Sequence, residues 1–234
     1  MSLESKLAAT TALLKTIAQA HPDAALANSY GAEDMVLTDL IASLGLPLQS
    51  FSLDTGRLPA ETYALMQQVA ERYPGHPVRV YFPDTAATEQ YVNLHGINGF
   101  YQSVDLRKSC CQVRKIEPLR RALAGRSAWI TGLRREQSPT RQDLASQEYD
   151  ADNGLQKFSP LLDWTEAEVW QYLRERQVPY NALHDRHYPS IGCAPCTRAI
   201  SVGEDIRAGR WWWENPETKE CGLHVKASPL QRPV

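Results

Sequence analysis

The chain has 234 residues, of which 43% are hydrophobic and 22% are charged, and its formal net charge is −2. This length allows one substantial core or two small ones. The nearly neutral charge gives no support to binding of nucleic acid or of a membrane surface, and no apolar run approaches the roughly 20 residues that cross a bilayer.

The N-terminal segment predicts an amphipathic helix. Leu7, Leu14 and Ile17 fall on about one helical face. Glu4 and Lys6 interrupt the apolar stretch that an export signal needs. We therefore expect a cytoplasmic protein whose thiols are reduced at rest.

The first half of the chain alternates short apolar runs with helical patterns. The apolar runs predict strands at residues 24–29, 49–53, 78–82 and 127–131. Helical patterns follow at 33–44, 59–73 and 114–124, and the last of these is expected to begin just after two neighbouring cysteines. Strands separated by helices of this length form right-handed crossovers. The pattern therefore predicts an α/β fold with a parallel sheet.

The second half contains one further clear helix, at residues 165–176, whose opening T-E-A-E fits a capping box. Residues 178–197 are rich in Pro, His and Gly and predict a loop. From residue 203 the chain is polar and Trp-rich, without a strand or helix pattern. We expect an α/β domain over residues 1–202 and a mobile C-terminal arm over residues 203–234.

The five cysteines form two tight pairs and one single residue. Cys110 and Cys111 are neighbours, Cys193 and Cys196 form a C-x-x-C pair, and Cys221 lies near the end. Side chains of consecutive residues point in different directions, so a vicinal pair does not easily bind one tetrahedral ion. Each member can bind a different iron of a polynuclear cluster. The pairs therefore favour an iron–sulfur cluster with four thiolate ligands.

Other interpretations of the two pairs remain open. C-x-x-C is a common half-site for structural zinc, and only the vicinal pair argues against that metal. Two disulfides are less favoured, because nothing in the chain argues for export. Inert buried thiols are not expected to fall into two tight pairs. For Cys221 taken alone, the favoured interpretation is an ordinary exposed thiol.

Two turns indicate a nucleotide site. S-Y-G-A-E-D, residues 29–34, joins the first predicted strand to a helix, and L-D-T-G, residues 53–56, follows the second strand in the equivalent position. Glycine lets the backbone approach a ligand, and the free N–H groups of a helix start face a phosphate. Either turn alone could equally be an ordinary strand-to-helix connection without a ligand. Two turns at the carboxyl edge of a parallel sheet favour a nucleotide.

Basic residues recur on loops expected at the same edge. A single arginine is more often a solvated surface charge, but several fork-shaped donors on one edge suit a phosphate or sulfate ester. The residues concerned are Lys115, Arg134, Arg135, Arg141, Arg207 and Arg210.

These motifs together resemble the assimilatory adenylyl-sulfate (APS) reductases, the iron–sulfur branch of the PAPS/APS reductase family. The matching segments are S-Y-G-A-E-D, L-D-T-G-R, C-C-x-x-R-K-x-E-P-L, T-G-L-R-R-E-Q-S, I-G-C-x-P-C-T-R, G-R-W-W-W-E and K-E-C-G-L-H. The resemblance spans about residues 24–224. The PAPS reductases share L-D-T-G and E-C-G-L-H but lack both cysteine pairs, which are therefore the discriminating feature.

The resemblance implies an adenine nucleotide alpha-hydrolase (ATP-pyrophosphatase-like) fold, a twisted, mainly parallel sheet with helices on both faces. It also implies a 4Fe-4S cluster on the two cysteine pairs. Residues matching Ser29, Gly31, Leu53, Asp54 and Thr55 hold adenosine 5′-phosphosulfate in the family, and Lys115 matches a lysine between cluster and sulfate. The residues at the charged end match Arg141, Arg207, Arg210 and His224. Many relatives have a serine where this chain has Tyr30, so backbone donors would have to replace that hydroxyl.

The activity implied is thioredoxin-dependent reduction of APS to sulfite and AMP in sulfate assimilation. Cys221 is the expected nucleophile: its thiolate attacks the sulfate sulfur, AMP leaves, and an S-sulfonate remains on the cysteine. Thioredoxin, or a similar dithiol donor, then releases sulfite.

Two other functions stay open. A PAPS reductase would need an extra basic contact for the 3′-phosphate and has no use for four more cysteines. A non-catalytic, nucleotide-binding iron–sulfur sensor would keep the four cysteines but would not need Cys221. The oligomeric state also stays open, and a homo-oligomer is compatible with the sequence.

Overall fold

The structure is a computed structural model that describes residues 2–137 and 141–215. Its elements follow one another as α1 (Leu3–Ala20), β1 (Ala25–Ala27), α2 (Ala32–Ser43), β2 (Gln49–Leu53), α3 (Ala60–Arg72), β3 (Val78–Tyr81), α4 (Thr85–His95), η1 (Gly99–Tyr101), α5 (Val104–Cys111), η2 (Gln112–Ile116), α6 (Glu117–Leu123), β4 (Ala128–Ile130), η3 (Arg135–Gln137), β5 (Gln147–Asp150), β6 (Leu155–Phe158), α7 (Glu166–Glu175), η5 (His184–Arg186) and η6 (Ala194–Cys196).

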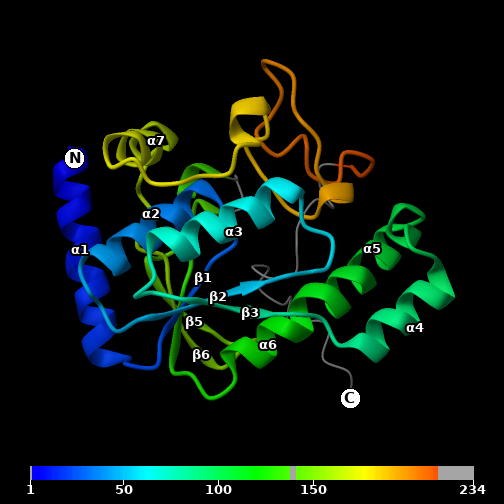
Figure 1. The fold of residues 1–234 in the computed structure, drawn as a ribbon, viewed down its shortest axis with the longest axis horizontal. Coiled ribbons are helices and arrows are strands. Elements are labelled where there is room, and N and C mark those ends of the chain that lie inside the picture. Colours follow the sequence, from blue (N-terminus) through cyan, green and yellow to red (C-terminus); the bar gives the residue numbers. More distant parts are fainter. Residues whose placement is uncertain (1, 138–140, 216–234) are drawn as a thin grey trace.

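The strands form one six-stranded sheet in the order β3-β2-β1-β4-β6-β5 (Figure 1). All neighbouring pairs are parallel except β5 and β6, which form an antiparallel pair at one edge. The chain enters the sheet at β1, continues outward through β2 to β3, and then crosses back to β4 on the other side of β1. This reversal places a topological switch point beside β1, where ligands of open α/β sheets bind.

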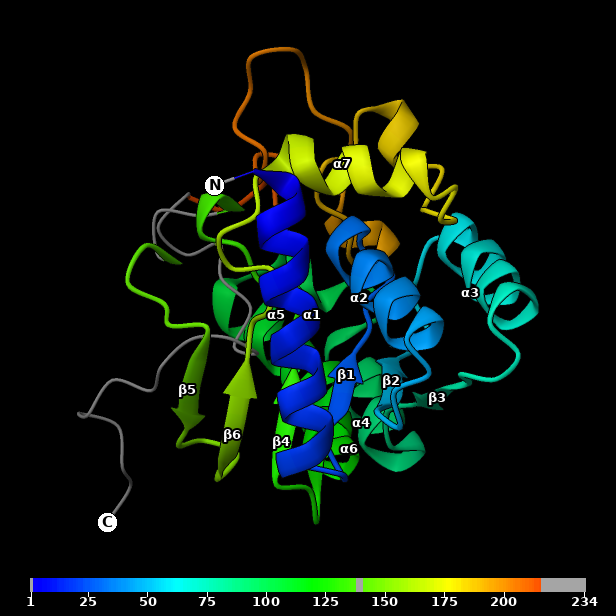
Figure 2. The same ribbon diagram turned by 90° about the vertical axis from the view of Figure 1, so that its left-hand side faces the viewer.

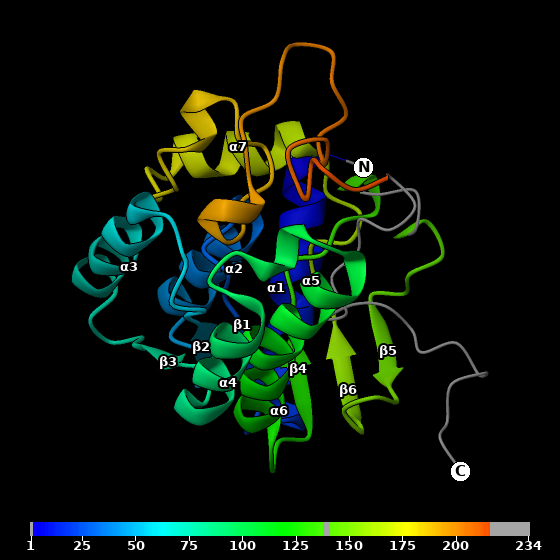
Figure 3. The ribbon, with the colours of Figure 1, turned by 90° about the vertical axis from the view of Figure 1, so that its right-hand side faces the viewer.

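Helices cover both faces of the sheet. Side chains of successive strand residues point to opposite faces, so Ala128 and Ile130 belong to the larger core, whereas Trp129 between them belongs to the smaller one. Helices α1, α2, α3 and α7 contribute to the larger core, and α6 packs on the smaller one. Figure 2 shows the face of α1 and α2, and Figure 3 shows the face of α6. The predicted fold class is confirmed.

The predicted strands and most predicted helices agree with the structure within a few residues. The helix expected at residues 114–124 is wrong in its start, because the helical run begins at Val104 and includes both vicinal cysteines. Helix α4 and the β5–β6 pair were not predicted. The capping box of α7 is confirmed: Glu168 N–H donates to Thr165 Oγ1, and Thr165 N–H donates to the Glu168 carboxylate.

The proposed arm at residues 203–234 lies partly outside the described residues, so its boundary and mobility stay predictions. Within the described part, Trp211 is fully buried and residue Thr197 forms an isolated antiparallel bridge with Arg210. None of the helices that the structure describes is both long enough and apolar enough to span a membrane.

Candidate functional site

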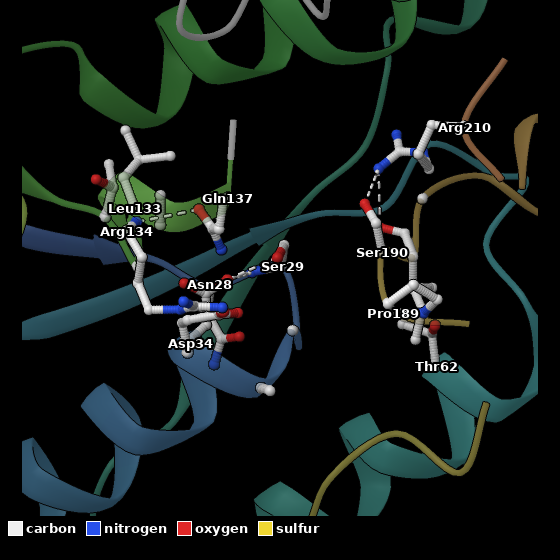
Figure 4. A pocket seen from close by; sticks show the side chains of 18 of the residues that line it. Asn28, Ser29, Asp34, Thr62, Leu133, Arg134, Gln137, Pro189, Ser190 and Arg210 are labelled. Carbon is white, nitrogen blue, oxygen red and sulfur yellow. Dashed lines mark hydrogen bonds and ion pairs between the residues drawn. The ribbon is translucent and has the colours of Figure 1, made fainter. Parts of the chain in front are cut away.

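One cavity of about 290 Å³ opens at the carboxyl ends of β1, β2 and β4. It is lined by most of the residues predicted to bind substrate, namely Ser29, Gly31, Leu53, Thr55, Lys115, Arg141, Arg207 and Arg210, and also by Cys193. Figure 4 shows two opposite sides. We call the side built by residues 28–34 and 131–137 the strand wall, and the side built by residues 189–193 and 206–211 the loop wall.

The turn after β1 is held by its own side chains. The Asn28 amide donates to Thr38 Oγ1 at 2.9 Å, and its carbonyl oxygen accepts from Tyr30 N–H at 2.7 Å. These contacts hold Tyr30 at φ 60°, a conformation that non-glycine residues seldom adopt. The Tyr30 side chain is buried in the larger core and is not among the cavity-lining residues. Backbone groups and Ser29 therefore face the ligand in this turn.

Ser29 is hydrogen-bonded to the buried carboxylate of Asp34. Its N–H and its hydroxyl both donate to Asp34 Oδ2, at 2.7 and 2.6 Å, so the Ser29 hydroxyl can only accept a hydrogen bond from a ligand. Asp34 also lies against the loop after β4, where a Cβ on Gly132 would come within 2.4 Å of Asp34 Oδ1. Burial raises the pKa of Asp34 to about 6, although the hydrogen bonds from Ser29 oppose this shift. Asp34 thus ties two strand ends together.

The turn after β2 braces both cysteine segments. Asp54 is buried, accepts from Gly56 N–H and from the Tyr63 hydroxyl, and does not line the cavity. Thr55 Oγ1 accepts from Arg57 N–H at 3.2 Å and lies 3.2 Å from Cys193 Sγ, so its hydroxyl hydrogen is left to donate to the sulfur. The sequence predicted only substrate binding for this turn and did not predict the contact of Thr55 with Cys193.

The vicinal cysteines end α5, and a π-helical segment follows them directly. Glu117 N–H bonds to Gln112 O, five residues back, just before Pro118, which cannot donate to the carbonyl four residues back. This segment carries Arg114 and Lys115. Arg114 is buried and donates to Thr55 O at 2.7 Å, which fixes the cysteine helix to the turn after β2.

The second cysteine pair reaches the same turn from the loop after α7. Ala194 N–H donates to Arg57 O at 2.8 Å. Tyr101, from the segment before α5, donates through its hydroxyl to Pro195 O at 2.6 Å. The two cysteine pairs, far apart in the sequence, are therefore held against one turn.

The four described cysteines are free thiols whose charges influence one another. Burial raises the pKa of Cys110, and Cys193 raises it further, whereas Arg114 and Lys115 lower it. Burial likewise raises the pKa of Cys196 to about 12, with opposite effects from Lys115 and Arg210. Four thiolates, of which Cys193 is buried and the others are partly buried, would repel one another, so this donor set suits a cationic group between the pairs.

The donor arrangement also bears on which metal group fits. Among the described residues, no three or more His, Cys, Asp or Glu side chains converge closely enough to hold a single metal ion. Vicinal thiols can each bind a different iron of a polynuclear cluster, and Cys110 and Cys111 offer such thiols together with Cys193 and Cys196. A 4Fe-4S cluster on these four residues stays a prediction.

Arg210 of the loop wall is held by hydrogen bonds and by an aromatic ring. It donates through Nη1 to Ser190 Oγ at 3.2 Å and to Ile191 O at 3.3 Å (Figure 4). A Cβ on Gly192 would come within 2.4 Å of the Arg210 guanidinium, so only glycine leaves room for it there. The guanidinium carbon lies 4.9 Å from the centre of the Trp211 ring.

The other predicted cations differ in their surroundings. Arg141 lines the cavity and donates to Gln137 of the strand wall. Arg134 lines it too, but its Nε donates to Glu33 at 2.7 Å. Arg135 pairs with Asp163 and is not among the lining residues, so its role is structural.

His184 was not singled out from the sequence. It lines the cavity, and neither ring nitrogen has a hydrogen-bond partner among the described residues, although both are buried. Burial lowers its pKa and favours the neutral ring. The only signal in the sequence was its position in the Pro- and His-rich loop. Cys221 and His224, expected at the charged end of the substrate, lie outside the described residues.

Comparisons with known proteins agree with this geometry. The family model for the phosphoadenosine phosphosulfate reductase domain matches residues 23–199. An adenosine 5′-phosphosulfate reductase of Allochromatium vinosum is 56% identical over 99% of this chain and 90% of its own length. The same-named protein of Burkholderia cepacia is 55% identical over 95% of this chain and 89% of its own.

Solved structures extend the comparison to the fold. A phosphoadenylyl-sulfate reductase from Candida auris, in a phosphate complex, superposes with a TM-score of 0.70 at 28% identity, over 82% of this chain and 90% of its own. An FMN adenylyltransferase from Candida glabrata, covering 98% of this chain and 78% of its own, has a TM-score of 0.58 at 16% identity, which is a likeness of fold alone. On its sequence, its fold and its cavity, the chain belongs to the PAPS/APS reductase family.

Proposed function

We propose that this protein reduces adenosine 5′-phosphosulfate to sulfite and AMP with electrons from thioredoxin or a similar dithiol. One observation carries the proposal: a single cavity is lined by the nucleotide turns of the sheet, by Lys115 and Arg210, and by Cys193 of the second cysteine pair. The names of two similar proteins, both adenosine 5′-phosphosulfate reductases, support the same substrate.

The binding half of the mechanism follows from the two walls. The start of α2 in the strand wall offers backbone N–H groups, which suit the nucleotide, and the short turn after β2 lines the same cavity through Leu53 and Thr55. The loop wall offers Arg207 and Arg210, and the π-helical segment offers Lys115. These cations would bind the phosphosulfate and would stabilise the negative charge that develops on the leaving phosphate.

The chemical half assigns the nucleophile to Cys221. Its thiolate forms a bond to the sulfate sulfur, the bond between that sulfur and the phosphate oxygen breaks, and AMP leaves with the electron pair. A thiolate of the dithiol then attacks the Cys221 sulfur, sulfite leaves, and a mixed disulfide remains. The second thiol of the dithiol attacks the partner's sulfur in that bond, which frees the Cys221 thiolate and leaves the dithiol as a disulfide. The two electrons thus come from the dithiol.

A 4Fe-4S cluster would be held by Cys110, Cys111, Cys193 and Cys196. When bound, it would supply a polynuclear charged group next to the cavity, whose own redox change the reaction does not require. Thr55 and Arg114 would hold the segments that carry its ligands, and Lys115 would stay directed at the substrate.

The test is turnover by anaerobically purified protein with APS or PAPS and with reduced thioredoxin. We expect sulfite and AMP from APS, and at least a tenfold lower kcat/KM with PAPS, since a charged 3′-phosphate needs a cation of its own. Preference for PAPS would support the alternative reductase. Nucleotide binding without turnover of either substrate would support the sensor.

A further inference from the structure

A buried ion pair joins the cysteine helix to the segment that carries Arg207 and Arg210. Arg107 of α5 donates through Nε and Nη2 to the two carboxylate oxygens of Glu214, at 2.9 and 2.8 Å. The exposed fractions of the two side chains are only 1% and 3%. A bidentate pair with this burial fixes both distance and orientation.

Trp211 connects this pair to the substrate cavity. The Arg107 guanidinium carbon lies 4.7 Å from the centre of the Trp211 ring, and that of Arg210 lies 4.9 Å from the same centre. Trp211 is fully buried, and its backbone N–H donates to Cys196 O at 3.2 Å. Arg107 and Arg210 are thus both stacked on the ring of a residue whose backbone is bonded to the second cysteine segment.

The backbone around Arg210 leaves little freedom for a different arrangement. Glu214 N–H donates to Trp211 O, and Arg210 N–H donates to Arg207 O, each at 2.9 Å. A Cβ on Gly209 would come within 2.3 Å of Arg198 O. A shift of Glu214 is therefore transmitted to the Trp211 ring and to the arginine beside it.

We propose that Arg107 and Glu214 are positioning residues, which act through Trp211 to hold Arg210 in the cavity for the charged end of the substrate. The inference rests on the proposed function for the identity of that substrate. On this inference, helix α5 does more than carry two cysteines. Through Arg107, the position of α5 sets the position of Arg210 in the cavity.

The test compares Glu214→Gln, Arg210→Ala and the double variant by equilibrium binding of APS. Each is made in the Cys221→Ser background, so that no turnover occurs. Glu214→Gln keeps the shape of the side chain and removes its charge. We expect the Kd for APS to rise on the order of tenfold to a hundredfold in the single variant, because small displacements of a binding group have effects of this size.

The double variant decides between positioning and general damage. If Glu214 acts through Arg210, adding Glu214→Gln to Arg210→Ala changes the Kd for APS less than about twofold, since coupled residues are not additive. An equal rise in Kd in both backgrounds, or no rise in either, would overturn the inference. Glu117→Gln, in the exposed pair with Arg121 on α6, is the matched control and should leave the Kd unchanged.

Folding and function are checked separately. Iron content and the thermal unfolding midpoint are measured for every variant. Should Glu214→Gln lose iron or unfold, Trp211→Phe takes its place in the same cycle, since it keeps an aromatic face of smaller area. Failure of the proposed function would appear as absent sulfite production by the protein with Cys221 intact. Failure of this inference would appear only in the binding cycle.

Discussion

The strand wall and the loop wall of the cavity are held together in different ways. In the strand wall, Ser29 bonds to Asp34 five residues away, and Asn28 bonds to Thr38 ten residues away. Its long-range contact, from Arg134 to Glu33 across 101 residues, joins segments that the parallel pairing of β1 with β4 already brings together. In the loop wall and its supports, Thr55 meets Cys193 across 138 residues, and Arg107 meets Glu214 across 107. Short-range contacts lose little chain entropy when they form, whereas the loop wall must first close long loops.

The two walls obtain their stability from different sources. The strand wall rests on the sheet and the larger core. The loop wall contains none of the strands that the structure describes, and it depends on the buried pair of Arg107 and Glu214, on a few hydrogen bonds and, in our proposal, on a metal cluster. Perturbing the cysteines should therefore disable the loop wall and spare much of the strand wall.

The largest expected effect is from Cys193→Ser. This variant should lose its iron and all measurable sulfite production together, while AMP binding weakens far less, because the nucleotide turn after β1 does not depend on the cysteines. Iron and acid-labile sulfide, the visible spectrum and calorimetric titration with AMP would check this. Stoichiometric zinc in the unmutated protein, without broad visible absorption after anaerobic purification, would contradict the cluster.

Lys115→Ala should have the second largest effect. Lys115 lines the cavity and is a charge partner of the thiols, so turnover should fall about 10²- to 10³-fold, as when one preorganised group that stabilises developing charge is removed. Iron content should stay near that of the unmutated protein. An iron loss as complete as in the cysteine variant would show that Lys115 is structural.

Asp34→Asn probes the strand wall through pH. With its folded pKa raised to about 6, Asp34 keeps its proton between about pH 4 and 6 when folded but not when unfolded, so its contribution to stability falls as pH rises through this window, by at most about 3 kcal/mol. Asparagine has no such dependence.

The thermal midpoint of the unmutated protein should therefore exceed that of Asp34→Asn by more at pH 5 than at pH 7. A gap that stays constant or widens with pH would show that the Asp34 carboxyl is already ionised at pH 5.

Thr55→Val should have the smallest effect. Losing the hydroxyl beside Cys193 removes about 1 kcal/mol of hydrogen bonding, so iron should be lost to a chelator several times faster under anaerobic conditions. Thr55→Ser, which keeps the hydroxyl, is the matched control. Iron loss from the valine variant no faster than from the serine variant would show that the hydrogen bond does not hold the cysteine segment.

The two walls also differ in how far the sequence alone could predict them. The turns at Ser29 and Leu53 follow apolar runs of strand length, so periodicity placed them at the sheet edge. The start of α5 was missed, because Arg107, Lys108 and Ser109 give that segment no apolar stripe, and the stabilising contacts of Arg107 lie at Glu214 and Trp211. The β5–β6 pair was missed because β5, Q-E-Y-D, has no apolar alternation.

Contacts between distant residues could not be derived from periodicity. That the two cysteine pairs meet was inferred from their chemistry and from the family resemblance. The role of Thr55 and Arg114 in joining them depends on the fold, since Arg114 donates to a backbone carbonyl that no side-chain pattern reveals. His184 stands out only once its buried nitrogens are seen to line the cavity.

In the proposed mechanism, the Cys221 thiolate acts on a phosphosulfate held between the two walls. The most direct measurement mixes the protein with APS without any dithiol and follows AMP release and the mass of each cysteine peptide. We predict about one AMP per active site and an added SO₃ unit on the Cys221 peptide alone, which reduced thioredoxin removes as sulfite. An adduct on another cysteine, or continued turnover by Cys221→Ser, would contradict the account.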